Sequence, residues 1–111
     1  MKRIRIDTPI KELTGENVKL AEGKLLTVKT VLLNLFGSFK GKDGEEAIQM
    51  YRVGCDLGKS TDWFVFHESD QQYIDAAVKA NTVQYTIIIY GQVAELVKHA
   101  EAYKAPAEVK K

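Results

Sequence analysis

One amphipathic stripe constrains the fold of this 111-residue chain more than any other feature of its sequence. After Thr27, apolar residues recur at i, i+3, i+4, i+7, i+8 and i+11, a spacing that puts them on one face of a helix. These residues are Val28, Val31, Leu32, Leu35, Phe36 and Phe39. Thr27 is a good N-cap, and Gly37 and Gly41 favour termination. The sequence therefore predicts a helix over residues 28–39 that contributes its apolar face to the core.

A capping box predicts the start of a second helix. Asp43 stands three residues before Glu46, and apolar residues with helical spacing follow. We expect this helix to end near Gly58, which would cap it. The predicted inner face consists of Ala47, Ile48, Tyr51, Cys55 and Gly58. Gly54 lies in the middle of this helix, where it permits a neighbouring element to approach closely.

Two further helices are expected in the second half of the chain. Ser69 with Gln72 gives a capping signature for a third helix, which ends near Asn81. Its predicted inner face consists of Tyr73, Ile74, Ala77 and Val78. Residues 83–90 contain three consecutive isoleucines, which favour a strand, but helical spacing continues beyond them. We interpret residues 82–103 as one helix that is buried most heavily in its first half.

The first 26 residues are predicted to form strands and turns. Ile4 and Ile6 alternate with charged residues, which is the period of a half-buried strand. Residues 10–13 and 18–21 then flank residues 14–17, a plausible hairpin turn. Such a short ribbon needs helices packed on it to be stable.

The predicted fold is therefore α+β, with a short N-terminal β-hairpin or ribbon packed on a bundle of three to four α-helices. We expect a single globular domain over residues 1–104 and a flexible C-terminal tail at residues 105–111. The predicted core consists of Val28, Val31, Leu32, Leu35, Phe36, Ile48, Tyr51, Ile74, Val78, Ile88, Leu96 and Val97.

Composition excludes several classes of protein. Hydrophobic residues make up 45% and charged residues 28% of the chain, as in an ordinary soluble globular domain. The formal charge of +1 gives no global attraction to nucleic acid or to an anionic membrane. Neither a membrane-spanning run nor a secretory signal is recognisable, and one cysteine cannot form an internal disulfide. We expect a cytoplasmic protein.

The motifs that suggest chemistry are weak. Residues 58–61 spell Gly-Lys-Ser-Thr, as at the end of a phosphate-binding loop, but Val53 stands where that loop needs its first glycine. His67 lies close to Glu68 and Asp70, yet no second cluster supplies further metal ligands. Cys55 is expected to behave as a small hydrophobe. We therefore expect no catalytic residue, no cofactor and no metal, and we do not expect an enzyme.

Charge is unevenly distributed along the chain. Residues 1–42 carry a net charge of +5, residues 43–81 carry −5 and residues 82–111 carry +1. The basic N-terminal strand, with Lys2, Arg3 and Arg5, could contact phosphates. A charge-segregated molecule could equally pair with copies of itself. A small nucleic-acid-binding module that uses these three residues is our alternative function.

The densest aromatic group stands beside acidic residues. Trp63 and Phe64 either plug the core or supply an interaction hot spot, and the flanking carboxylates disfavour base stacking. The candidate protein-binding residues are Asp62, Trp63, Phe64, Glu68 and Asp70. Our leading function is a non-enzymatic accessory protein that binds another protein, with self-association as one form of that binding.

Four strings distributed along the chain support this interpretation. They are IRIDTPIKELTGENV, LTVKTVLLNLF, GEEAIQMYRVG and YGQVAELV. In this order the chain resembles small uncharacterised proteins encoded by tailed bacteriophages and prophages, from Ile4 to about Val97. The resemblance implies a bacterial or viral cytoplasmic setting and an accessory role, and it assigns no function to any single residue.

Overall fold

A computed structural model of the chain describes residues 1–19, 23–40 and 43–102. Within these ranges it contains four α-helices, a 3₁₀ turn and one three-stranded antiparallel sheet, so the predicted α+β class is confirmed. The elements are β1 (Lys2–Arg5), α1 (Val28–Ser38), α2 (Gly44–Lys59), β2 (Trp63–Phe66), η2 (Glu68–Asp70), α3 (Gln71–Ala80), α4 (Ile87–Lys98) and β3 (Glu101–Ala102). The predicted tail at residues 105–111 lies outside the described residues.

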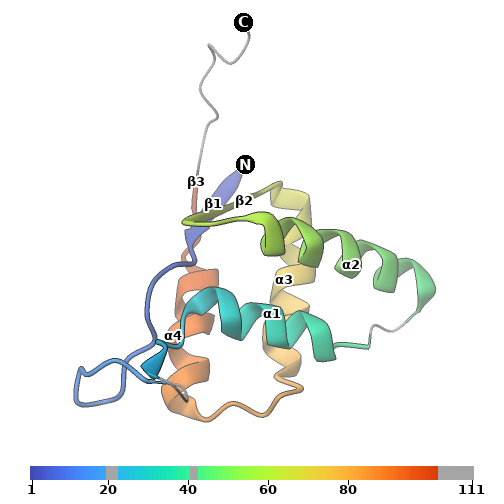
Figure 1. Ribbon diagram of the computed structural model, residues 1–111. Helices are drawn as coiled ribbons and strands as arrows, with labels where there is room; N and C mark the ends of the chain where they lie inside the picture. Colours follow the sequence, from blue (N-terminus) through green and yellow to red (C-terminus); the bar gives the residue numbers. More distant parts are fainter. Residues whose placement is uncertain (20–22, 41–42, 103–111) are drawn as a thin grey trace, which may run out of the picture.

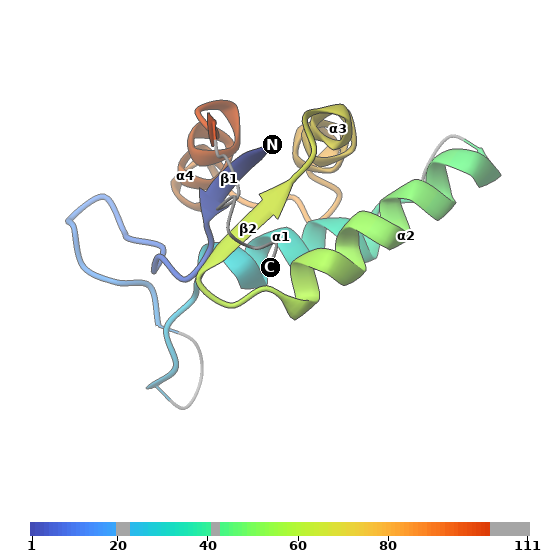
Figure 2. The same cartoon turned by 90° about the horizontal axis from the view of Figure 1, so that it is seen from above.

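The helices form two pairs beneath the sheet. Figure 1 shows α1 and α2 running side by side in front of α3 and α4, with the sheet lying over one end of the rear pair. The view from above confirms this arrangement, and it shows that the first turns of α2 extend well beyond the other elements (Figure 2). The front side of α1 and α2 is therefore not covered by another helix.

The sheet joins distant parts of the chain. Its strand order is β2-β1-β3, and β1 lies antiparallel to both neighbours. Ile4 lies opposite Phe64, and both side chains are buried together with Phe66 on the inner face. Because side chains alternate across a strand, the next positions point outward. These outward residues are Arg3, Arg5, Trp63 and Val65.

The predicted N-terminal hairpin is wrong in its pairing. The segment after β1 forms single-residue bridges, such as Lys11 with Asn17, and not two regular strands. The predicted turn is present, because the Glu12 N–H donates to the Glu16 carbonyl at 2.7 Å. Ile10 is fully buried whereas Leu13 is 83% exposed, so this ribbon has only a narrow apolar anchor. A strand ladder needs more buried side chains than this segment supplies.

Helix α1 forms as predicted and occupies the centre of the core. The Thr27 hydroxyl caps it by accepting the Thr30 N–H at 3.4 Å. Its buried residues are Val28, Val31, Leu32 and Leu35. Phe36 and Phe39, at the end of the predicted stripe, are half-buried and border the open front side.

Helix α2 begins as predicted but buries a different face. The Asp43 carboxylate accepts the Glu46 N–H at 2.8 Å, which confirms the N-cap. Ile48 and Tyr51, which were assigned to the core, are 68% and 75% exposed. The buried residues are Met50, Val53 and Leu57. These three residues form a second apolar ridge with spacing i, i+3 and i+7. Helices α1 and α3 pack against this ridge and not against the predicted one. Ser60 caps the helix, so the assignment of Gly58 as the cap is also wrong.

Helix α3 starts at Gln71, one residue later than a cap at Ser69 predicts. The 3₁₀ turn η2 precedes it, and the Gln72 side chain donates to the Ser69 carbonyl at 3.0 Å. Ser69 therefore does not cap the helix. The predicted inner face is otherwise correct, since Ile74, Ala77 and Val78 are buried.

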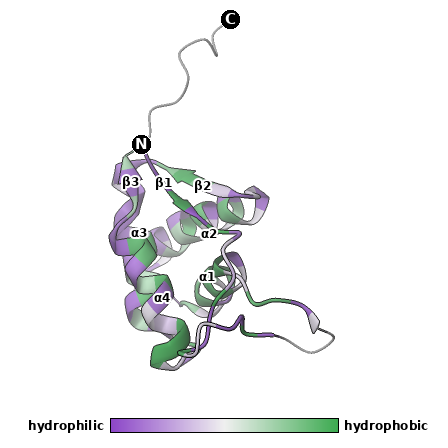
Figure 3. Cartoon of the chain, turned by 90° about the vertical axis from the view of Figure 1, so that its left-hand side faces the viewer, coloured by the Kyte–Doolittle hydropathy of each residue, from purple (hydrophilic) through white to green (hydrophobic). Residues whose placement is uncertain are grey.

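The predicted helix over residues 82–103 is too long. Asn81 adopts a left-handed conformation (φ 43°), and its side-chain amide exchanges hydrogen bonds with the Tyr85 backbone at 2.9 and 3.1 Å. The chain therefore turns before α4 begins at Ile87. Figure 3 colours the first turn of α4 strongly hydrophobic, yet Ile87 is 82% exposed. The buried residues, Val93 and Val97, lie in the second half, which reverses our expectation.

The predicted core is correct at most positions outside α2. Three of its members are only half-buried, namely Phe36, Ile88 and Leu96, and of these Phe36 and Leu96 pack against the core. The sequence analysis missed the contribution of the N-terminal segment. Ile4, Ile6 and Ile10 are all buried, although the predicted core contained none of them.

Two helical glycines give a test of the packing. A Cβ added to Gly54 would meet Phe36 at 3.8 Å, which is an ordinary contact, and one added to Gly91 would meet nothing within 4 Å. Because alanine is a better helix former by about 1 kcal/mol, both Gly54→Ala and Gly91→Ala should raise the free energy of unfolding by about that amount. Urea denaturation measures this effect. Destabilisation by Gly54→Ala alone would mean that α1 and α2 pack more closely than described.

Candidate functional site

An apolar groove lies between α1 and α2 on the uncovered front side of the molecule. It has a volume of about 380 Å³ and is open to solvent. From α1 and its C-cap, the lining residues are Leu33, Phe36, Gly37 and Phe39. From α2, they are Ala47, Met50, Tyr51, Gly54 and Cys55. We call this feature the α1–α2 groove. Its walls are two rigid helices, so it is a preformed surface with the shape that a helix or an aromatic side chain can enter.

Helix α2 exposes large apolar side chains in the groove lining and beside it. Ile48 is 68% exposed and Tyr51 is 75% exposed, one turn apart on the helix. A side-chain hydrogen bond with Cys55 raises the pKa of Tyr51. Exposed apolar residues that adjoin an apolar groove mark interaction surfaces more often than isolated ones do.

Several carboxylates are exposed along α2 and at its start. Asp43, Glu45 and Asp56 are exposed on α2 or at its start. The main basic group on the same helix, Arg52, is already engaged. It donates to Asp70 at 2.8 Å, and its side chain is also 3.9 Å from Asp56. The exposed carboxylates of α2 and its N-cap therefore outnumber its basic groups, Arg52 and Lys59.

The structure does not bring the five predicted protein-binding residues onto one surface. Asp62 and Glu68 are exposed, but they lie at opposite ends of β2. Phe64 is only 1% exposed, because it points to the inner face of the sheet. Asp70 is 7% exposed and accepts a hydrogen bond from Arg52. The assignments of Phe64 and Asp70 to a binding surface are therefore wrong.

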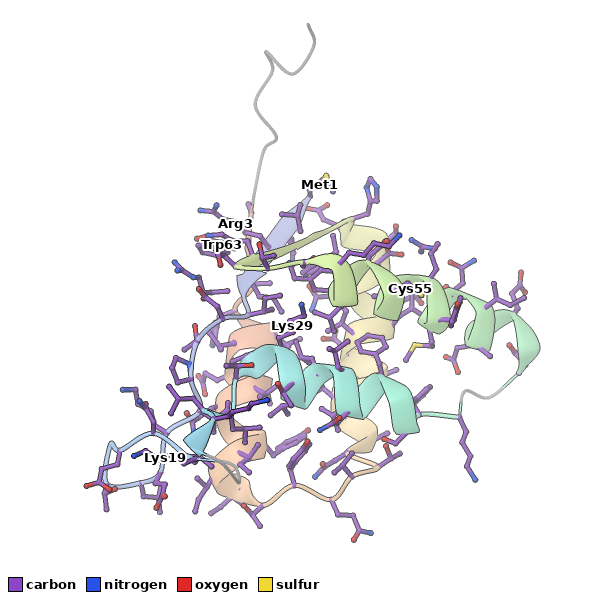
Figure 4. The ribbon with its side chains drawn as sticks, in the orientation of Figure 1. Met1, Arg3, Lys19, Lys29, Cys55 and Trp63 are labelled. Carbon is purple, nitrogen blue, oxygen red and sulfur yellow. The ribbon has the colours of Figure 1, made fainter. Side chains whose placement is uncertain are left out.

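Trp63 belongs to a small cluster on the outer face of the sheet. The Arg3 guanidinium lies 3.9 Å from the centre of its ring, and the Arg5 guanidinium lies 5.3 Å from it. Figure 4 shows Arg3 and Trp63 together at the sheet, well away from Cys55 on α2. Trp63 is half-buried by these contacts. Its ring thus packs within the molecule and keeps only an exposed edge.

The three basic residues of the nucleic-acid alternative are close together, but two of them bind carboxylates. Arg3 donates to Glu101 at 2.8 Å, and Arg5 donates to both oxygens of Asp7 at 2.6 and 3.1 Å. The hydrogen bond to Arg5 lowers the pKa of Asp7. A phosphate would have to displace these carboxylates. Lys2, at the start of the same strand, is half-buried.

The weaker motifs have structural explanations. Residues 58–61 lie at the end of α2, whereas a phosphate-binding loop precedes a helix. Cys55 is a free thiol that lines the groove. His67 precedes η2 and makes no side-chain cap bond. Over the described ranges, no group of three or more His, Cys, Asp or Glu residues is placed to hold a metal ion.

Comparison with protein-family models, with curated proteins and with solved structures gives no match to this chain. Among the helices of the described residues, none has the length and apolar character needed to cross a membrane. The site must therefore be interpreted from its own chemistry. The sequence analysis considered only one apolar ridge of α2 and therefore did not predict the α1–α2 groove. The helix has two such ridges, and a comparison of them would have indicated that one stays exposed when the other is buried.

The Arg52–Asp70 pair can be tested with a matched control. Asp70→Asn removes a buried carboxylate that Arg52 bonds, and Glu68→Gln makes the same change at an exposed position nearby. A hydrogen bond to a charged group contributes about 1 kcal/mol or more, so Asp70→Asn should lower the melting temperature by at least about 4 °C. Glu68→Gln should leave it unchanged. Equal melting of both variants by circular dichroism would contradict the pairing.

Proposed function

We propose that this chain is a non-enzymatic accessory protein that binds another protein through the α1–α2 groove. We further propose that it acts in the cytoplasm of a bacterial cell or an infected host cell and has a phage or prophage origin, which rests on the resemblance of its sequence strings. The observation that carries the proposal is the open apolar groove, with Tyr51 exposed in its lining and Ile48 exposed about one turn before it on α2. The proposed surface replaces the one expected around Trp63.

The shape of the groove supports a helical partner. Amphipathic helices bind by laying an apolar ridge into a groove between two helices, with anchors at i, i+3, i+4 and i+7. The groove offers an apolar surface for such a ridge. Its lining includes Phe36 and Phe39 on one wall and Met50 on the other. Tyrosine is enriched among the residues that dominate binding energy, and Tyr51 belongs to the same lining.

The charge around the groove supports a basic partner. Residues 43–81 carry a net charge of −5, and exposed carboxylates lie along α2. Opposite charges steer encounter and raise the association rate, whereas the apolar contacts retain the partner. We therefore expect an amphipathic helix that carries lysine or arginine beside its apolar ridge.

The same chemistry favours protein binding over the other classes. Tyr51 and Cys55 are the titratable residues of the described groove lining, and the remaining residues are apolar or glycine. A catalytic site needs an acid, base or nucleophile aimed at a substrate, and this lining offers packing instead. The alternative nucleic-acid surface is disfavoured because Arg3 and Arg5 are already bonded to carboxylates.

Two synthetic peptides test the proposal. Both are helical and have leucine at i, i+3, i+4 and i+7, and the polar positions are lysine in one and glutamate in the other. The lysine peptide should bind at least about tenfold more tightly, and Ile48→Ser should weaken its binding about fivefold or more because an apolar anchor contributes about 1 kcal/mol. Fluorescence anisotropy measures both dissociation constants.

Ile87→Ser is the matched control for this experiment. Ile87 is 82% exposed on α4, away from the groove, so its loss should leave peptide affinity unchanged. Circular dichroism checks that both variants remain folded. Equal peptide affinity for wild type and Ile48→Ser would refute binding through the groove. A DNA duplex that binds wild type and is released by Arg3→Ala, without any peptide binding, would favour the nucleic-acid alternative.

A further inference from the structure

The exposed face of α2 has the properties of a self-complementary surface. Ile48, Cys55 and Lys59 follow one another at i, i+7 and i+11, with Arg52 at i+4, so they form a stripe along the uncovered side of the helix. Tyr51 lies beside this stripe and also borders the α1–α2 groove. Apolar and basic residues alternate along the stripe, and Glu45 and Glu46 precede it in the first turn of the helix.

We propose that the partner at this face is a second copy of the chain, with the two α2 helices packed antiparallel about a two-fold axis. This inference rests on the proposed function, since it names the partner that covers the exposed face of α2 beside the groove. A two-fold contact uses the same patch on both chains, so each residue that makes a contact does so twice. Two chains can therefore associate through the same surface if that surface carries both residues of each contacting pair.

The register follows from the positions of the apolar residues. With the two-fold axis beside Tyr51 and Arg52, Ile48 lies opposite Cys55 of the partner subunit. Both are among the least polar residues of the stripe, and each would be covered by the other. Tyr51 then lies opposite Arg52 of the partner subunit, an arrangement that allows the guanidinium to pack on the phenol ring.

Charge complementarity selects the antiparallel direction. Helix α2 has Glu45 and Glu46 in its first turn and Lys59 in its last turn. Antiparallel packing places the acidic start of each helix within one residue of the basic end of its copy. A parallel arrangement would place like charges together at both ends. Opposed helix dipoles favour the same direction.

The charges of α2 itself permit this association. The helix carries Arg52 and Lys59 as well as Glu45, Glu46 and Asp56, so two copies present groups of both signs to each other. The position of α2 also permits the contact, because its first turns project sideways beyond the other elements (Figure 2). An α2 helix from a copy can therefore approach without meeting the sheet or α4.

Cysteine cross-linking tests both the contact and its register. In Ile48→Cys, the new thiol would lie opposite the natural Cys55 of the partner subunit, so mild oxidation should produce a disulfide-linked dimer. The same two positions within one chain are seven residues apart on a helix, about 10 Å, which is too far for a disulfide. Mass spectrometry of the oxidised dimer should identify a disulfide between positions 48 and 55.

Ile87→Cys is the control, because it adds an exposed thiol on α4 to the same natural cysteine. We expect at least tenfold more cross-linked dimer from Ile48→Cys than from Ile87→Cys or from wild type on a non-reducing gel. Analytical ultracentrifugation of the wild-type chain should show a concentration-dependent dimer, and Ile48→Glu should remain a monomer.

The outcomes separate this inference from the proposed function. Equal cross-linking of the two cysteine variants, or a monomeric wild-type chain at all concentrations, would overturn the second-copy inference. If the lysine peptide still bound wild type and not Ile48→Ser, protein binding through the groove would stand with a different partner. A disulfide between two Cys55 residues would overturn the proposed register. Failure of both the peptide and the cross-link would overturn both proposals.

Discussion

The N-terminal segment holds the rest of the structure in place. It pairs with β2 as strand β1, so that Ile4 and Phe64, which are 60 positions apart in the sequence, are buried together in the core. Immediately after β1, the carbonyls of Ile6 and Thr8 accept the N–H groups of Lys29 and Val28 at 2.9 and 3.0 Å. The first turn of a helix leaves such N–H groups without partners, and here a distant segment supplies them. Strand pairing and the start of α1 thus depend on the same few residues.

This arrangement determines which surface remains free. The sheet and the rear helices cover one side of α1, and α1 and α3 cover the ridge of α2 that contains Val53. Two further bonds support this position of α2. Lys29 donates to the Ser60 carbonyl at 2.6 Å, and Arg52 donates to Asp70. With α2 held in this rotation, its other apolar ridge faces solvent beside the groove, which is why the proposed binding surface lies there.

Local signals in the sequence predicted the local structure. The caps at Thr27 and Asp43 depend on one side chain and an N–H group three residues away, and both are confirmed. The partner of β1 could not be predicted in this way, because strand pairing over such a separation depends on the packing of the whole chain. The start of α4 was missed because the left-handed conformations of Asn81 and Gln84 interrupt a favourable helical pattern.

The candidate site shows the same division between local and tertiary information. The sequence indicated that the acidic middle of the chain with its aromatic residues would carry the interaction surface. It could not show that Phe64 points inward or that Arg3 packs over Trp63, since both follow from the register of β1 and β2. Helix α2 has two apolar ridges of similar strength, and only the positions of α1 and α3 decide which one is buried.

The free energies of unfolding of Ile48→Ala and Leu57→Ala therefore test the account most directly. Leu57 is fully buried and Ile48 is 68% exposed on the opposite side of the same helix. At a low protein concentration, Leu57→Ala should cost about 2–5 kcal/mol, and Ile48→Ala should change stability by no more than about 0.5 kcal/mol. A loss at Ile48 as large as the loss at Leu57 would show that Ile48 belongs to the core, and the exposed binding face of α2 would not exist.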